Sequence, residues 1–160
     1  MATFHLVSGP IGAGKTTKAL EIADQTDAIL FSPDQWMHAS GIPLRNSEVR
    51  TYIEQAQLKI ALLVLSQGSD VVIDWGTWGR AERLDIISRV KAEGNTVNGY
   101  FLTPELSVLM SQVETRESNW RISDRATQSE IVDSLENFEN PQSDELLEYA
   151  EIWFSGSEGF

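Results

Sequence analysis

A short glycine-rich stretch near the start of the chain, GPIGAGKT, constrains the possible fold more than any other part of the sequence. It runs from Gly9 to Thr16, lies between an apolar run and a helix-like segment, and fits the pattern G-x-x-x-x-G-K-S/T. In loops of this pattern the glycines let the backbone curl, so that successive amide groups and the N-terminus of the following helix point at a phosphate. The stretch therefore predicts a strand, a phosphate-binding loop and a helix, in that order.

Each residue type in this loop has a place in binding a nucleoside triphosphate. Lys15 is expected to reach the β- and γ-phosphates, and the hydroxyl group of Thr16 is expected to be a ligand of Mg²⁺. The other predicted nucleotide-binding residues of the loop are Gly9, Gly12, Ala13, Gly14 and Thr17. The glycine spacing differs from the G-x-G-x-x-G pattern of dinucleotide-binding proteins, which argues against NAD or FAD.

Composition bounds the kind of protein that carries this loop. The chain has 160 residues, 41% of them hydrophobic, which suits a single domain with a core over residues 1–160. A net charge of −12 argues against general nucleic-acid affinity, which depends on Lys and Arg side chains that neutralise phosphates. With no cysteine and two histidines, a structural zinc site is not expected. Neither a secretory signal nor a membrane-spanning run is apparent, so we expect a cytoplasmic protein.

Short apolar runs alternate with helix-period segments, which is typical of βαβ units and a parallel sheet. Strands are predicted at 4–7, 28–31, 71–73 and 97–102, with a weaker fifth candidate at 149–154. One predicted helix ends near Gly68, and its apolar face is Val49, Ile53, Ala56, Ile60, Leu63 and Val64. A second closes at Gly94, and Thr103 is expected to cap a third.

The stretch SPDQWM places an aspartate, Asp34, just after the second predicted strand. Parallel strands deliver side chains to the carboxyl edge of the sheet, where ligands bind. A carboxylate there could accept the proton of an acceptor hydroxyl group, as a general base must. Alternatively, Asp34 could cap a helical turn that begins at Gln35 and Trp36. The residues alone leave both interpretations open.

A second aspartate, Asp74, directly follows the third predicted strand in DVVIDWGTWGRAER. It is typical of a Walker B carboxylate that holds Mg²⁺ through water, with an ordinary strand-end turn residue as the alternative. Tryptophans near these strand ends could wall a substrate pocket or fill the core, and the arginines could meet an anionic substrate group or pair with neighbouring acids. The candidate substrate residues are Trp36, Trp75, Trp78, Arg80 and Arg83.

The polar stretch ETRESNWRISDRATQ concentrates arginines in a chain that is short of positive charge. A segment at approximately 116–128 could fold over a bound triphosphate as a lid and bring Arg116, Arg121 and Arg125 to the transferred phosphoryl group. The alternative is a solvated helix surface whose arginines pair with acids. Beyond Arg125 there is no Lys or Arg, which favours a solvated acidic face over an acidic docking surface.

Three of these stretches together, GPIGAGKTT, SPDQWM and DWGTWGRAER, carry a resemblance to a known family. Residues 4 to about 125 resemble the small P-loop kinases often described as AAA-type ATP-binding domains, which are similar to zeta toxins, chloramphenicol phosphotransferase and the P-loop domains of polynucleotide kinases. The resemblance implies ATP as the nucleotide and a three-layer α/β fold. Its twisted parallel sheet would have the order 2-3-1-4 and a possible fifth strand, with helices on both faces and a helical lid.

The resemblance also implies roles for the candidate residues. Asp34 would be the base, Lys15 and Thr16 would bind phosphates and Mg²⁺, and Asp74 would lie near the metal. The catalytic lid arginines would be Arg116 and Arg121, with Arg125 as a further nucleotide contact.

The implied activity is ATP-dependent transfer of the γ-phosphoryl group to a hydroxyl group of a small-molecule acceptor. One alternative is an ATP-binding or ATP-hydrolysing regulatory module for a protein partner. The other is a polynucleotide 5′-hydroxyl kinase, although a net charge of −12 gives no sign of the basic channel that such an enzyme needs.

Overall fold

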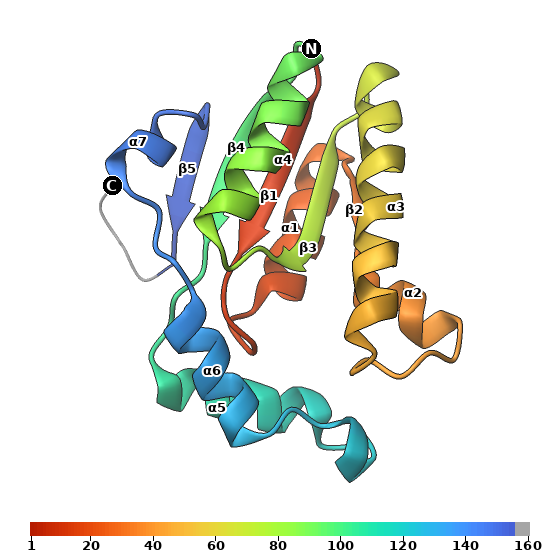
Figure 1. The fold of residues 1–160 in the computed structure, drawn as a ribbon, viewed down its shortest axis with the longest axis vertical. Helices are drawn as coiled ribbons and strands as arrows, with labels where there is room; N and C mark the ends of the chain where they lie inside the picture. The colour runs from red at the N-terminus through yellow and green to blue at the C-terminus, as the bar shows by residue number, and fades with distance from the viewer. Residues whose placement is uncertain (156–160) are drawn as a thin grey trace.

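Five parallel strands form the centre of the molecule. The computed structural model describes residues 1–155, apart from the side chain of Ser123. The sheet order is β2-β3-β1-β4-β5 (Figure 1). The strands are β1 (Thr3–Ser8), β2 (Ile29–Phe31), β3 (Val71–Gly76), β4 (Thr96–Phe101) and β5 (Glu151–Phe154). The predicted α/β fold and the order 2-3-1-4 are confirmed, and the weak fifth candidate is the edge strand β5.

Helices cover both faces of this sheet, which gives three layers. Helices α3 (Ser47–Ser66) and α4 (Arg80–Ala92) lie on one face, and α1 (Lys15–Thr26) lies on the other (Figure 1). The remaining helices are α2 (Pro33–Ala39), α5 (Leu106–Glu117), α6 (Gln128–Asn137) and α7 (Ser143–Leu146), with a 3₁₀ turn at Ile122–Asp124. One apolar cluster packs α3 and α4 against the sheet, and a second packs α1, α5 and α6.

Strands β1 and β3 are buried on both faces over most of their length, whereas burial alternates along β4. Phe4 and Leu6 in β1 and Ile73 in β3 are completely buried. Asp74 lies inside β3 rather than after it, because the strand continues to Gly76. No helix within the part of the chain that the structure describes is long and apolar enough to cross a membrane.

Two local predictions about the helices are wrong. Helix α5 begins at Leu106 with Glu105 at its N-cap, and the backbone amide of Thr103, outside the helix, donates a hydrogen bond to the hydroxyl group of Ser155 at 3.0 Å. The buried side of α3 is formed by Gln57, Leu58, Ala61 and Leu65, whereas Ile60 and Leu63 are exposed. Apolar residues are spread around α3, so their spacing does not select the face that packs on the sheet.

Candidate active site

The loop between β1 and α1 has the geometry of an anion-binding cradle. Gly12 and Gly14 have φ angles of +84° and +94°. A Cβ atom on Gly12 would lie 2.7 Å from the carbonyl oxygen of Leu109, so a larger residue would displace α5. Gly14 occupies the N-cap of α1 and has no side chain to satisfy the first amide groups of the helix. Those amide groups are left for an anionic ligand.

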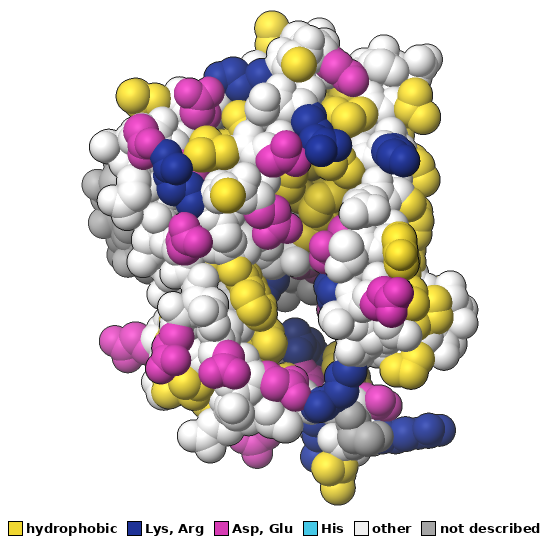
Figure 2. Space-filling model, in the orientation of Figure 1, with side chains coloured by type: hydrophobic (Ala, Val, Ile, Leu, Met, Phe, Trp, Pro, Cys, Tyr) yellow, Lys and Arg dark blue, Asp and Glu magenta, His cyan; other side chains and the backbone are white. Residues whose placement is uncertain are grey.

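This loop opens into a cleft of about 970 Å³. Figure 2 shows it as a hollow with Lys and Arg side chains at its lower border. From the predicted loop residues it is lined by Gly12, Ala13, Gly14, Lys15, Thr16 and Thr17. The other predicted residues that line it are Asp34, Asp74, Trp75, Trp78 and Arg116. Gly9 is not among the lining residues, and its carbonyl oxygen accepts a hydrogen bond from the indole of Trp78 at 3.1 Å.

Two oxygen donors that suit Mg²⁺ meet in this cleft. The hydroxyl group of Thr16 donates a hydrogen bond to Oδ2 of Asp74 at 2.7 Å. Mg²⁺ prefers oxygen ligands and usually takes one or two carboxylates, with phosphate oxygens and waters completing its shell. Within residues 1–155, no group of three or more acidic or histidine side chains could hold a metal alone. The donor set therefore fits an ion shared between the protein and a bound nucleotide.

Positive charge converges on the loop lysine. The ammonium group of Lys15 donates to the carbonyl oxygen of Pro10 at 2.8 Å. Burial lowers the pKa of Lys15 to about 8, while the nearby carboxylate of Asp74 raises it and the charges of Arg116 and Arg50 lower it further. Three cationic side chains in one cleft repel one another, and a bound polyanion would relieve that repulsion.

Asp34 reaches the same cleft from the first turn of α2. The N-cap of this helix is Ser32, whose hydroxyl group accepts a hydrogen bond from the amide of Gln35 at 3.4 Å. The alternative in which Asp34 caps the helix is therefore wrong. The side chain of Asp34 is 53% exposed, and its Oδ1 atom accepts a hydrogen bond from Nη2 of Arg50 on α3.

Among the further carboxylates that line the cleft, sequence reasoning did not propose Glu54 on α3 or Glu82 on α4 as site residues. Burial raises the pKa of Glu54 to about 7, helped by the charge of Glu82 and opposed by Arg50. Burial also raises the pKa of Glu82. Together with Asp34, they place acidic side chains in the same cleft as Lys15. Their spacing on separate helices carries no local motif that could have identified them.

Replacing Glu54 with glutamine is expected to stabilise the nucleotide-free protein at pH 8 and to change its stability little at pH 5. The pKa of Glu54 is about 7 in the folded protein, against an ordinary value of 4.5. As the pH rises between these values, the unfolded chain releases the proton first, so the wild type loses stability across that window. Urea unfolding at both pH values measures the difference.

The matched control for this prediction is Glu48→Gln, which removes an exposed carboxylate from the first turn of the same helix. The same pH-dependent gain in both variants would contradict the assignment of the effect to the burial of Glu54.

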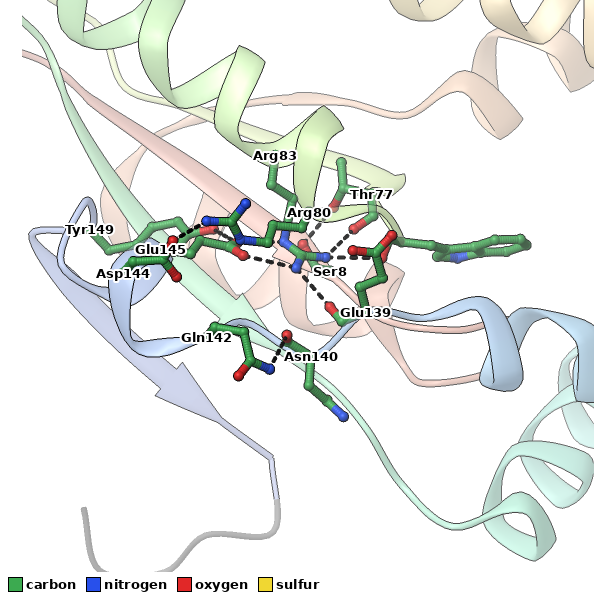
Figure 3. Close-up of polar contacts among 11 residues, drawn as sticks. Ser8, Thr77, Arg80, Arg83, Glu139, Asn140, Gln142, Asp144, Glu145 and Tyr149 are labelled. Atoms are coloured by element: carbon green, nitrogen blue, oxygen red, sulfur yellow. Dashed lines mark hydrogen bonds and ion pairs between the residues drawn. The ribbon is translucent and has the colours of Figure 1, made fainter.

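Arg83 lies outside the cleft, in a buried polar network (Figure 3). Its Nε and Nη2 atoms donate to the two carboxylate oxygens of Glu145 at 2.6 and 3.0 Å. Nη1 donates to the carbonyl oxygens of Thr77 and Trp78 at 3.0 and 3.1 Å, and Nη2 also donates to that of Glu139 at 2.7 Å. The prediction that Arg83 contacts substrate is therefore corrected, because its guanidinium group is wholly enclosed by protein.

This network fixes the turn between β3 and α4. Thr77, a β-branched residue, has a φ angle of +43°, a strained conformation that needs support from its surroundings. Arg83 binds its carbonyl oxygen, and the hydroxyl groups of Ser8 and Thr77 are hydrogen-bonded to each other. Glu145 also accepts a hydrogen bond from Tyr149 at 2.8 Å. Glu145 is buried, so it departs from the solvated acidic face predicted for the end of the chain.

The remaining substrate candidates divide between the cleft and its surroundings. Trp75 and Trp78 line the cleft and are also anchored in the protein, with the indole of Trp75 donating to Oε1 of Gln57 at 2.9 Å. Trp36 instead packs near Phe31, with ring centroids 6.2 Å apart. Arg80 pairs with Asp144 outside the cleft. Neither Trp36 nor Arg80 is among the residues that line the cleft.

The segment predicted as a lid lies between α5 and α6. Arg116 lines the cleft, whereas Arg121 and Arg125 are not among its lining residues. Arg125 donates to the carbonyl oxygens of Trp120 and Ser118 at 3.0 and 2.8 Å, so it folds the segment on itself. Arg45, which sequence reasoning missed, lies between α2 and α3 and binds this segment. Arg45 donates to the carbonyl oxygen of Arg125 and pairs with Glu130 at 2.8 Å.

The sheet order, the glycine loop and the adjoining oxygen donors define a P-loop nucleotide-binding domain. The chain belongs to the AAA domain family, whose profile matches residues 4–141. A search of curated proteins found no significant match.

Solved structures with this fold include several kinases. A gluconokinase from Sinorhizobium meliloti 1021 is 18% identical, with a TM-score of 0.59 and coverage of 96% of this chain and 81% of the other. A sugar kinase from Janibacter sp. HTCC2649 is 20% identical, with a TM-score of 0.65 and coverage of 96% and 84%. A chain of the Pnkp1/Rnl/Hen1 RNA repair complex is 14% identical, with a TM-score of 0.75 and coverage of 86% and 44%. At these identities the similarity shows a common fold.

Proposed function

We propose that this protein is an ATP-dependent kinase that transfers the γ-phosphoryl group of ATP to a hydroxyl group of a small-molecule acceptor. The observation that carries the proposal is the position of Asp34, whose half-exposed carboxylate lines the same cleft as Lys15 and Thr16. A carboxylate beside a phosphate site is what transfer to a hydroxyl group requires. The kinase names of two proteins with this fold support the same activity.

The proposed mechanism assigns a step to each group. Thr16 and Asp74 would hold Mg²⁺, which would supply positive charge to the phosphates of the nucleotide. Asp34 accepts the proton of the acceptor hydroxyl group, while the oxygen of that hydroxyl group forms a bond to the γ-phosphorus. The bond from that phosphorus to the bridging oxygen breaks, and its electron pair leaves with ADP. Lys15 and Arg116 stabilise the negative charge that is redistributed during transfer.

The carboxyl groups of Asp34, Glu54 and Glu82 favour a small neutral or cationic acceptor. All three residues line the cleft, and Arg50 pairs with Asp34 and Glu54. A polynucleotide would bring several phosphates to the half-exposed carboxylate of Asp34, on a chain with a net charge of −12, where like charges repel. The structure of an RNA repair complex shares the fold, but this distribution of charge supports a small molecule over a polynucleotide 5′-hydroxyl end.

Replacing Asp34 with asparagine is expected to lower acceptor-dependent ADP production by about 10²–10⁴-fold, the usual contribution of a general base. ADP production with Mg²⁺ and ATP should be measured across nucleosides, aminoglycosides, sugars, amino alcohols and a short 5′-hydroxyl oligonucleotide. One class should stimulate the wild type. The variant should still bind ATP, because Asp34 is outside the glycine loop.

Asp24→Asn, on the exposed surface of α1, is the matched control and should retain wild-type activity. Slow turnover that responds to no acceptor and is the same in Asp34→Asn would contradict the kinase proposal. That result would favour a nucleotide-dependent regulatory module for a protein partner.

A further inference from the structure

Arg50 is a cation between two carboxylates, and the mechanism above does not use it. It lies in the first turn of α3, and its side chain is 29% exposed. Nη2 contacts Oδ1 of Asp34, and Nη1 lies 3.7 Å from Oε1 of Glu54. All three residues line the cleft. The guanidinium group therefore has a primary partner in Asp34 and a second carboxylate within reach.

Arg50 also shares the cleft with the phosphate-binding loop. Lys15, the lysine of that loop, lines the same cleft as Arg50. A planar guanidinium group matches a phosphate group at least as well as it matches a carboxylate. A γ-phosphate held by Lys15 would therefore compete with Asp34 for Arg50.

The pairing has a direct consequence for the carboxylate. An oxygen of Asp34 that accepts a hydrogen bond from Arg50 is a poorer proton acceptor than a free one, because the guanidinium charge stabilises the ionised form. The nucleotide-free arrangement therefore holds Asp34 in place but weakens it as a base. If Arg50 moved from Asp34 to another anion, Asp34 would become a stronger base.

We propose that Arg50 is a positioning residue, which holds Asp34 before ATP binds and shifts toward the γ-phosphate when ATP is bound. Glu54 is its second anchor and keeps the guanidinium group in the cleft during the exchange. The base is thereby released only when the phosphoryl group is in place. The part of this inference that concerns the base rests on the proposed kinase function.

The other cleft arginines are paired with residues other than Asp34. Arg116 donates to Glu117, its neighbour in sequence, at 3.1 Å from Nε. Arg45 pairs with Glu130 and binds the segment between α5 and α6. Arg50 alone among these three is paired with the proposed base, and it projects from a helix of 20 residues packed on the sheet.

Calorimetric titration with Mg·ADP and Mg·AMP-PNP tests the exchange, because these probes differ in the γ-phosphate. Arg50→Gln should weaken Mg·AMP-PNP binding by about tenfold or more, the size expected for a lost charged hydrogen bond. Binding of Mg·ADP should change by less than about twofold, and Arg50→Lys should recover part of the loss. Arg89→Gln, which breaks an exposed pair with Asp85 on α4, is the matched control and should affect neither nucleotide.

Carbon-13 NMR of the aspartate carboxyl groups tests the pairing itself, with Asp34→Asn used to assign the signal. In nucleotide-free Arg50→Gln, the pKa of Asp34 should be higher than in the wild type by about one unit or more, since an adjacent positive charge is lost. Adding Mg·AMP-PNP to the wild type should raise it as well, whereas Mg·ADP should raise it less.

Equal weakening of both nucleotides in Arg50→Gln, or an unchanged affinity for Mg·AMP-PNP, would overturn the exchange. An unchanged pKa of Asp34 in that variant would overturn the pairing. Neither measurement uses a phosphoryl acceptor. If no acceptor stimulates ADP production, the kinase proposal fails while these results still stand. If an acceptor is found but Arg50→Gln binds both nucleotides normally, this inference alone fails.

Discussion

Replacing Arg83 with methionine is expected to lower the free energy of unfolding by about 3–5 kcal/mol, because the buried carboxylate of Glu145 then has no cationic partner. The side chains of Arg83 and Glu145 are both completely buried. Once the guanidinium group is removed, the carboxylate of Glu145 keeps only its hydrogen bond from Tyr149 among the contacts described above. The carbonyl oxygens of Thr77 and Trp78 lose a donor in the same step.

Urea unfolding followed by circular dichroism measures this loss. Arg80→Met is the matched control, because Arg80 and Asp144 form an ion pair with exposed carboxylate and should contribute only about 0–1 kcal/mol. The double variant Arg83→Met, Glu145→Gln should recover part of the loss, since no charge is then buried. A loss in Arg83→Met as small as that in Arg80→Met would contradict a supporting role for the network.

The fold was predictable because its main signals are local. The spacing from Gly9 to Thr16 specifies a strand, a loop and a helix, and apolar runs mark the other strands. Parallel strands then bring Asp34 and Asp74 to one edge without any knowledge of their contacts. The sequence therefore predicts the glycine loop and the two aspartates as parts of one site, and Lys15, Thr16, Asp34 and Asp74 line one cleft in the structure.

The rest depends on pairs that are distant in sequence. Arg83 and Glu145 are 62 positions apart, and their partnership is decided by the packing of the last helix and strand. Two arginines in DWGTWGRAER therefore read alike, although Arg83 is buried and Arg80 is at the surface. The pairing of Arg50 with Asp34 has the same character, because it depends on how α2 and α3 meet. No residue periodicity records such contacts.

Replacing Lys15 with methionine is expected to lower the proposed kinase activity strongly and yet to stabilise the nucleotide-free protein at pH 7. Loss of a preorganised charge at the phosphates should lower the turnover number by about 10²–10³-fold. The pKa of Lys15 is lowered from its ordinary value of 10.5 to about 8, chiefly by burial. At pH 7 the wild type therefore holds a charge that its surroundings disfavour, and methionine of similar shape removes that charge.

The size of this gain should depend on pH. Below pH 8 Lys15 is protonated in both the folded and the unfolded chain, so the cost of its burial is fully present. As the pH rises toward 10.5, the folded protein releases the proton first and the wild type regains stability. The advantage of Lys15→Met should therefore be largest at pH 7 and smaller at pH 9.5. Lys59→Met on the exposed side of α3 is the matched control, and an advantage of Lys15→Met that did not vary with pH would assign it to packing instead of charge.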